Sequence, residues 1–427
     1  MTDVLPPPPP LSPPRPGPSA AAPASTERGW GNHVGLLVLL ALAAALALTR
    51  GWASLFFVLA ILLMIFLHEL GHYVTAKWAG MKVTQFFIGF GPRIWSFHRG
   101  ETEYGVKALP LGAYVRIAGM HNLDPVDPAD EDRAYRNKPF WRRISVAVAG
   151  STMHFLLALV LAFALVAGYG KPSDDHWHVT TVVPGSPAAA AGLVPGDKLV
   201  EINGVSMQNH TEAVTYIRAH PGEQATITVN RDGRIFQTDA RFADHNSAGE
   251  AVGFLGFGIQ LELVRPSLGA AFSDTGSLYV TSFKNAFVGI GHFFSPRGVT
   301  NYVTTLMNKP DATNPGSKPA SEDRPISVIG LVDLGGDASH AGLPYVLELM
   351  VLFNVFIGVF NLIPLLPLDG GHVGIAVYER LRSRKGQPMY HADITKLLPL
   401  TYAVIMLLGV LFVSTVFLDL VDPIRIN

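Results

Sequence analysis

An uncharged stretch that ends in three ionisable residues constrains this chain more than any other feature. Residues 52–67 carry no charge, and His68, Glu69 and His72 follow almost directly. Ionisable side chains are costly inside a lipid bilayer, so their presence at the end of such a stretch indicates a function. The sequence therefore predicts a membrane-spanning helix that carries a reactive site.

The spacing of these residues fits a metal site on a helix. His68 and His72 are four residues apart and share one helix face, while Glu69 lies one step around the helix. HExxH on a helix is the pattern of zinc peptidases, in which the glutamate is the general base. Two histidines and a carboxylate leave one zinc position for water, whose pKa the metal lowers to about 7. A chance match among the 15 histidines is the alternative, and the membrane context argues against it.

Asp369 is the candidate third ligand. It lies in the segment NLIPLLPLDGG at 361–371, which follows an apolar stretch that begins near Tyr345. Prolines end helices and leave backbone groups free, so a carboxylate held at this break can turn toward the HExxH helix. Asn361 is a candidate donor to a substrate carbonyl or to the developing oxyanion. A helix-capping aspartate at an Asp-Gly turn is the alternative for Asp369.

Together these segments resemble the site-2 proteases, the membrane zinc metalloproteases of regulated intramembrane proteolysis. The resemblance rests on HELGH at 68–72, on NLIPLLPLDGG at 361–371 and on a PDZ-like segment between them, and it covers residues 52–420. The stretch 80–120 is similar to the bacterial members that carry a PDZ domain, including actinobacterial ones. The expected activity is hydrolysis of peptide bonds within the bilayer.

The resemblance also implies roles for individual residues. One zinc ion per chain is expected, with Glu69 as the catalytic acid and base and with three ligands: His68, His72 and Asp369. One position departs from the family pattern, because many members have Gly-Pro-x-x-Asn where this chain has GSTMH at 150–154. His154 is a candidate for a hydrogen bond toward the active site. A histidine bonded to a neighbouring helix carbonyl is the alternative.

The composition is typical of a polytopic α-helical membrane protein, because 49% of the residues are apolar and only 15% are charged. The net charge of −1 argues against a nucleic-acid partner, and the absence of cysteine excludes disulfides. Four core transmembrane helices and one extra N-terminal helix are expected. The five predicted spans are 30–50, 52–74, 144–168, 344–364 and 397–418.

A soluble unit is expected between two halves of the membrane core. The predicted parts are a disordered Pro-rich cytosolic tail (1–29), the extra helix (30–50), the first half of the peptidase core (52–168), a PDZ-like α+β domain (178–262), an amphipathic or linker region (263–343) and the second half of the core (344–420). The PDZ-like domain is expected to bind an extended peptide or to exclude large ectodomains.

Interrupted alternation between Glu101 and Met120 predicts a membrane-associated β-hairpin. A strand edge there can hold an unwound substrate by adding it as a further strand. An ordinary cytosolic hairpin is the alternative.

Basic residues indicate the orientation of the spans. Arg142 and Arg143 precede the third span, Lys77 and Lys82 follow HELGH, and four basic residues at 380–385 precede the last span. Positive loops stay in the cytoplasm, so the active site is expected toward the cytosol of a bacterial inner membrane and the PDZ-like domain outside. The resemblance implies substrates that are single-span membrane proteins, either anti-sigma factors or remnant signal peptides, after a first extracytoplasmic cut.

Two other functions are compatible with parts of the sequence. One is a catalytically inactive membrane scaffold whose PDZ-like domain binds partners, which the complete HELGH and LDGG elements disfavour. The other is a zinc hydrolase that acts on a lipid or a small polar substrate, which the PDZ-like segment and the strand-like loop disfavour.

Overall fold

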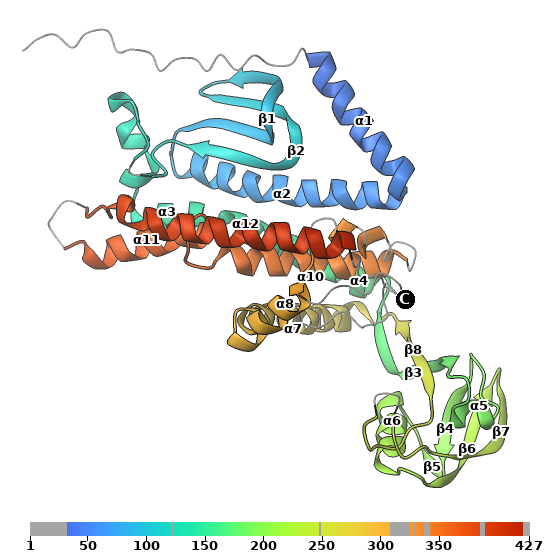
Figure 1. The fold of residues 1–427 in the computed structure, drawn as a ribbon. Coiled ribbons are helices and arrows are strands. Elements are labelled where there is room, and N and C mark those ends of the chain that lie inside the picture. Colours follow the sequence, from blue (N-terminus) through green and yellow to red (C-terminus); the bar gives the residue numbers. More distant parts are fainter. Residues whose placement is uncertain are drawn as a thin grey trace, which may run out of the picture.

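The molecule has a body of long helices with a β-sheet on one side, and a small domain joined to that body by two strands (Figure 1). The computed structural model describes residues 32–121, 123–246, 249–307, 325–327, 330–332, 334–336, 342–384 and 389–421. The predicted tail (1–29) and the stretch 308–324 of the predicted linker region lie outside the described residues.

Four helical segments are long and apolar enough to cross a membrane. They are α2 (Trp52–Trp78), α4 (Ala149–Gly168), α10 (Leu343–Asn361) and the continuous pair of η3 (Ile394–Leu397) and α12 (Leu398–Val421). The four predicted core helices are therefore confirmed. The extra helix is present as α1 (Asn32–Arg50), but its apolar stretch Val34–Arg50 is shorter than the roughly 20 residues of a typical span.

α2 lies at the centre of the helical body, with the β-sheet on one side and α3 (Phe140–Ala147) and α4 on the other (Figure 1). Phe57 and Met64 of α2 are buried in one apolar cluster with Met350 of α10. Ala158 and Ala162 of α4 are completely buried. Small residues at helix contacts let membrane helices approach closely, which explains the tight packing around α2.

The β-sheet is larger than the sequence predicted. β1 (Val83–Arg99) pairs antiparallel with β2 (Thr102–Ile117), so the expected hairpin within 101–120 is instead one strand that finds its partner upstream. Phe86 of β1 lies opposite both Tyr104 and Val115, which places the first half of β1 between the two halves of β2. Bends at glycines allow this folding, and Gly89, for example, has φ +88°. Residues 113–117 thereby become an outer strand that contacts α2.

Two short 3₁₀ helices, η1 (Pro128–Arg133) and η2 (Tyr135–Asn137), connect this sheet to α3. The Asp127 carboxylate accepts a hydrogen bond from the Ala129 N–H and so caps η1.

The small domain leaves the helical body on the antiparallel pair β3 (Lys171–Val182) and β8 (Phe257–Val264). Its four-stranded sheet has the order β5-β4-β6-β7 and its core includes Trp177, Leu199 and Ile227. The elements are α5 (Pro187–Ala190), β4 (Lys198–Ile202), β5 (Val205–Ser206), α6 (His210–Ala219), β6 (Gln224–Arg231) and β7 (Arg234–Arg241). The predicted domain at 178–262 falls within this unit, and its PDZ identity stays a prediction.

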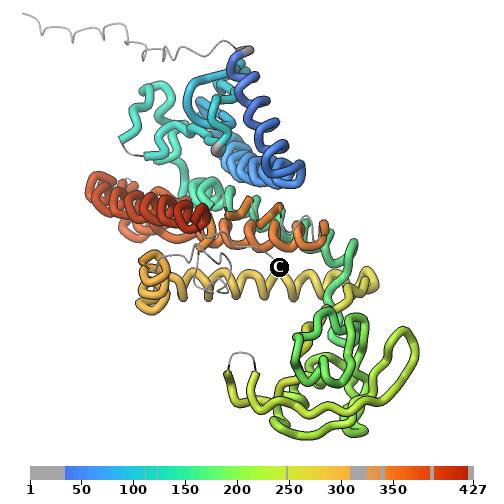
Figure 2. The backbone as a smooth tube through the Cα atoms, turned by 45° about the vertical axis from the view of Figure 1, so that its right-hand side comes forward, coloured from blue at the N-terminus to red at the C-terminus, as the bar shows by residue number. Residues whose placement is uncertain are grey.

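After the small domain the chain returns to the helical body. α7 (Leu268–Phe293) and α8 (Pro296–Met307) follow β8, and Figure 2 shows α7 between the long helices and the small domain. Phe283 of α7 packs against Phe155 of α4 with ring centroids 4.8 Å apart. α11 (Asp369–Arg382) packs against α3 on the other side of the body.

Candidate metal centre

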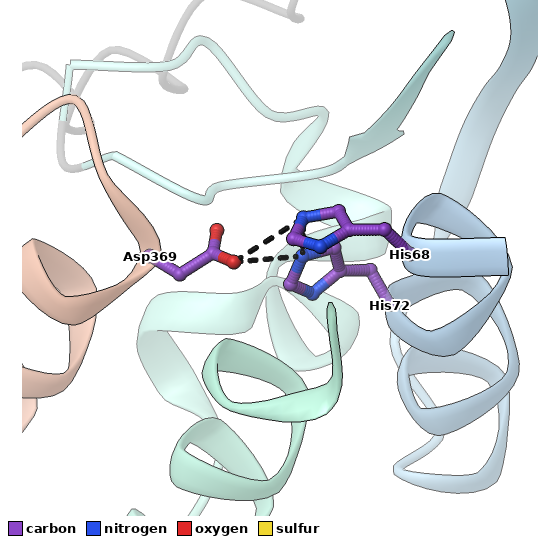
Figure 3. Close-up of side chains that lie close together, drawn as sticks. All are labelled: His68, His72 and Asp369. Atoms are coloured by element: carbon purple, nitrogen blue, oxygen red, sulfur yellow. Dashed lines mark hydrogen bonds and ion pairs between the residues drawn. The ribbon is translucent and has the colours of Figure 1, made fainter. Parts of the chain in front are cut away.

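Two segments almost 300 positions apart in the chain meet at one cluster of side chains. His68 and His72 lie one turn apart on α2, and Asp369 is the first residue of α11 (Figure 3). The Nε2 atoms of the two histidines are 3.2 Å apart, and each lies 3.3 Å from Oδ2 of Asp369. The structure therefore brings together the three residues that the sequence predicts as ligands.

The turn between α10 and α11 places Asp369. α10 ends at Asn361 and α11 begins at Asp369, so the proline-containing segment breaks the helix as predicted. Gly370 and Gly371 follow at positions where a Cβ would come within 2.3 Å of backbone oxygens of the turn and within 2.6 Å of the Leu366 nitrogen, respectively. Only glycine fits there, which explains why two glycines follow the aspartate.

The histidine rings are held by neighbouring helices. Nδ1 of His72 lies 2.7 Å from the carbonyl oxygen of Val146 in α3. A carbonyl only accepts, so Nδ1 carries the proton and Nε2 presents its lone pair to the cluster. Gly150 at the start of α4 lets that helix lie against the other ring, because a Cβ there would be 2.3 Å from His68 Cε1.

The arrangement fits a zinc ion. Tetrahedral zinc with bonds of about 2.0–2.1 Å has ligand atoms about 3.3–3.4 Å apart, and the three ligand atoms lie 3.2–3.3 Å apart. Oδ2 of Asp369 is buried and has no hydrogen-bond partner among the described residues. Burial raises the pKa of Asp369, but the imidazoles of His68 and His72 outweigh burial and hold this pKa below its usual range. The carboxylate is thus ionised, as a zinc ligand must be.

Glu69 lies next to the cluster, half-buried, and contacts the β-sheet. Its Oε2 accepts a hydrogen bond of 3.1 Å from the backbone N–H of Val115. The carboxylate is therefore fixed between α2 and the outer strand 113–117.

His154 lies beside the metal cluster, and Asn361 is not part of the cluster. The ring centroid of His154 is 5.1 Å from that of His68, and its Nδ1 lies 2.9 Å from Oδ1 of Asn354. The Asn354 amide in turn donates to the Met350 carbonyl at 2.8 Å, which fixes its orientation. Asn361 is the half-buried last residue of α10 and is not one of the three clustered residues.

Sequence reasoning missed Asn354, which is completely buried. Its signal is a lone amide within the apolar run of α10, since isolated polar residues in a span mark partners or sites. The helix-carbonyl partner considered for His154 is not found in the structure, and a side-chain amide takes that place. The supporting groups of Val146 and Val115 are backbone atoms and leave no mark in the sequence.

Two further histidines lie near α11. His372, one turn after Asp369, is buried, and its ring centroid is 5.1 Å from that of His121. Burial lowers the pKa of His372 to about 4, so this ring is neutral at physiological pH. It adds no positive charge beside the cluster.

Comparison with known proteins places this site in a family. The family model for peptidase family M50 matches residues 56–408. The chain belongs to peptidase family M50. This is the site-2 protease family that the sequence resembles, and the chain is a zinc metalloprotease of that family.

Curated relatives agree over most of their length. Zinc metalloprotease Rip1 of Mycobacterium tuberculosis is 34% identical over 411 residues, which cover 87% of this chain and 97% of the relative. Rip1 of Mycolicibacterium smegmatis is 32% identical over 421 residues, with 88% and 99% covered. A putative zinc metalloprotease of Brucella suis is 27% identical over 366 residues, with 81% and 91% covered.

Among solved structures, the PDZ domain of an SdrC-like protein from Listeria monocytogenes is similar to part of this M50 protease. The match has 24% identity and a TM-score of 0.18, and it covers 21% of this chain and 92% of the other.

Proposed function

We propose that this M50 protease hydrolyses peptide bonds within or beside the transmembrane segment of single-span membrane proteins. The observation that carries the proposal is the triangle of His68, His72 and Asp369 on helices of a membrane body, with Glu69 held between that triangle and a strand edge. His68, His72 and Asp369 would hold one zinc ion. A bound zinc ion supplies Lewis acidity, which polarises a peptide carbonyl and lowers the pKa of water.

Glu69 is the proposed general base and acid. Its carboxylate takes a proton from the attacking water and later gives that proton to the leaving amine. The hydrogen bond from Val115 orients this carboxylate and connects it to the outer strand 113–117. An unwound substrate that pairs with this strand as a further β-strand would present its backbone next to Glu69.

His154 is the proposed contact to the substrate backbone. In the neutral ring Nδ1 donates to Oδ1 of Asn354, which leaves Nε2 as an acceptor. An acceptor suits a substrate N–H better than an oxyanion, so we assign His154 to binding of the unwound backbone. Asn361 remains the proposed donor to the substrate carbonyl.

The proposed orientation follows from the basic residues at the ends of the spans. The active site faces the cytoplasm of a bacterial inner membrane and the small domain lies outside. The proposed substrates are anti-sigma factors or remnant signal peptides after a first cut outside. The small domain, proposed as PDZ-like, acts on these substrates as a filter or a binding module.

The test compares cleavage of a single-span model peptide by the wild type, by Glu69→Gln and by Glu262→Gln, a control at an exposed position of β8. General acid–base catalysis contributes about 10²–10⁴-fold, so kcat of Glu69→Gln should fall by about that factor. Its zinc content, measured by elemental mass spectrometry, should stay that of the wild type. A chelator should abolish cleavage and added zinc should restore it.

Continued cleavage by Glu69→Gln at the wild-type rate would contradict the mechanism. Binding of the peptide without cleavage by the wild type would instead support the inactive scaffold. Mass spectrometry of the products locates the cut, and a cut outside the transmembrane segment and its flanks would contradict the proposed substrate class.

A further inference from the structure

A second cavity lies between α3 and α11, apart from the metal cluster. Its volume is about 810 Å³, and its charged lining residues are Arg143, Glu379, Arg380 and Arg384. Three arginines face one glutamate, so the lining carries an excess of two positive charges. Nothing in the catalytic proposal uses these residues.

The inner end of this cavity is a buried ion pair. Nη1 of Arg143 lies 2.6 Å from Oε2 of Glu379, with side-chain exposures of 5% and 2%. The other oxygen of Glu379 accepts a hydrogen bond from the Ala392 N–H at 2.6 Å. Nε of Arg143, by contrast, is buried without a hydrogen-bond partner among the described residues. A buried guanidinium donor without an acceptor is unfavourable, and an anion in the cavity would supply one.

The outer end of the cavity combines charge with exposed apolar surface. Arg380 and Arg384 are exposed, and Leu381 beside them is 80% exposed. Trp141 is 76% exposed and contacts Phe140, which lines the cavity. Arginines beside exposed aromatic and aliphatic side chains are typical of the headgroup level of a membrane, where basic pockets bind lipid phosphates.

We propose that this cavity binds a phosphate group, as carried by an anionic phospholipid or by a soluble phosphate. Arg380 and Arg384 attract the anion and the guanidinium of Arg143 hydrogen-bonds it. Planar guanidinium groups match phosphate geometry, which favours phosphate over a carboxylate of the same charge.

The cavity also lies between the two helices that position the metal ligands. One turn after Arg143, the carbonyl of Val146 in α3 orients His72. Glu379 lies on the same helix, α11, that begins with Asp369. A ligand between α3 and α11 therefore sets the spacing of these two supports. This part of the inference rests on the proposed function, whereas the binding itself does not.

The test measures lipid binding before activity. The full chain in detergent is titrated with phosphatidylglycerol or phosphatidylcholine, and bound lipids are counted by native mass spectrometry. The variant is Arg380→Gln with Arg384→Gln, and the matched control is Arg234→Gln with Arg241→Gln on β7, where both arginines are also exposed. Loss of each arginine should weaken phosphatidylglycerol binding about fivefold, and loss of both about thirtyfold. Phosphatidylcholine binding and the control should be unchanged.

Equal binding of phosphatidylglycerol by the cavity variant and the control would overturn the proposal. Competition with millimolar inorganic phosphate separates the two sources of the group: displacement of the lipid assigns the cavity to a soluble phosphate, and retention assigns it to the lipid. In nanodiscs, phosphatidylglycerol should change the cleavage rate of the wild type but not of the cavity variant. Failure of cleavage altogether would leave the binding result standing, so the two proposals fail separately.

Discussion

At the scale of single residues, the site depends on how closely α4 approaches α2. Gly150 is the contact point, since a Cβ there would overlap the His68 ring at 2.3 Å. Gly150→Ala should therefore displace the ring, reduce zinc content and destabilise the protein by about 1–3 kcal/mol, as overpacking does. Thermal unfolding and elemental mass spectrometry measure both effects.

Gly168→Ala is the matched control for Gly150→Ala. It lies on the same helix, and nothing lies within 4 Å of its added Cβ. It should retain its zinc and its unfolding temperature. Identical behaviour of the two variants would show that α4 does not press on His68.

His154 offers a second test at this scale. His154→Leu removes the proposed acceptor for the substrate backbone, and a net hydrogen bond is worth about 0.5–1.5 kcal/mol. KM for the model peptide should rise by roughly three- to tenfold with zinc content unchanged. A fall in kcat at constant KM would move His154 from substrate binding to the chemical step.

At the scale of elements, the packing of α11 on α3 depends on one buried ion pair. Glu379→Gln leaves Arg143 charged in a site where its side chain is 5% exposed. Loss of one partner of a buried pair costs about 3–5 kcal/mol, because the remaining charge is uncompensated. The unfolding temperature should fall clearly, while Glu262→Gln at an exposed position should not change it.

The double change Arg143→Met with Glu379→Leu completes this test. Replacing both partners by apolar residues of similar volume is often neutral, so this variant should recover much of the stability. A stability of Glu379→Gln equal to the wild type would show that Arg143 has another counter-charge.

At the scale of the whole molecule, the small domain is attached through one place. Lys171 of β3 pairs with Val264 of β8, so the two connections to the helical body lie side by side. The domain also has its own apolar core. A short Gly-Ser linker in place of residues 172–263 should therefore leave a body that folds and still cleaves a short single-span peptide.

Substrates with an intact ectodomain then reveal what the domain does. Cleavage should rise if the domain excludes them and fall if it binds them. Loss of cooperative unfolding after excision would contradict an independent helical body.

The sequence by itself determined the four core spans, the break before Asp369 and the three clustered ligands. Uncharged length marks a span, prolines mark a helix end, and the four-residue spacing of His68 and His72 places both on one helix face. These signals are local, so they can be read without a fold.

Only the tertiary structure decided how the site is supported. The Val146 carbonyl on His72 and the Val115 N–H on Glu69 are backbone groups that any residue type carries. The pairing of β2 with 83–99 and the contact of His154 with Asn354 join positions far apart in the chain. Such contacts follow from the packing of whole helices and strands, and no local pattern of residues specifies them.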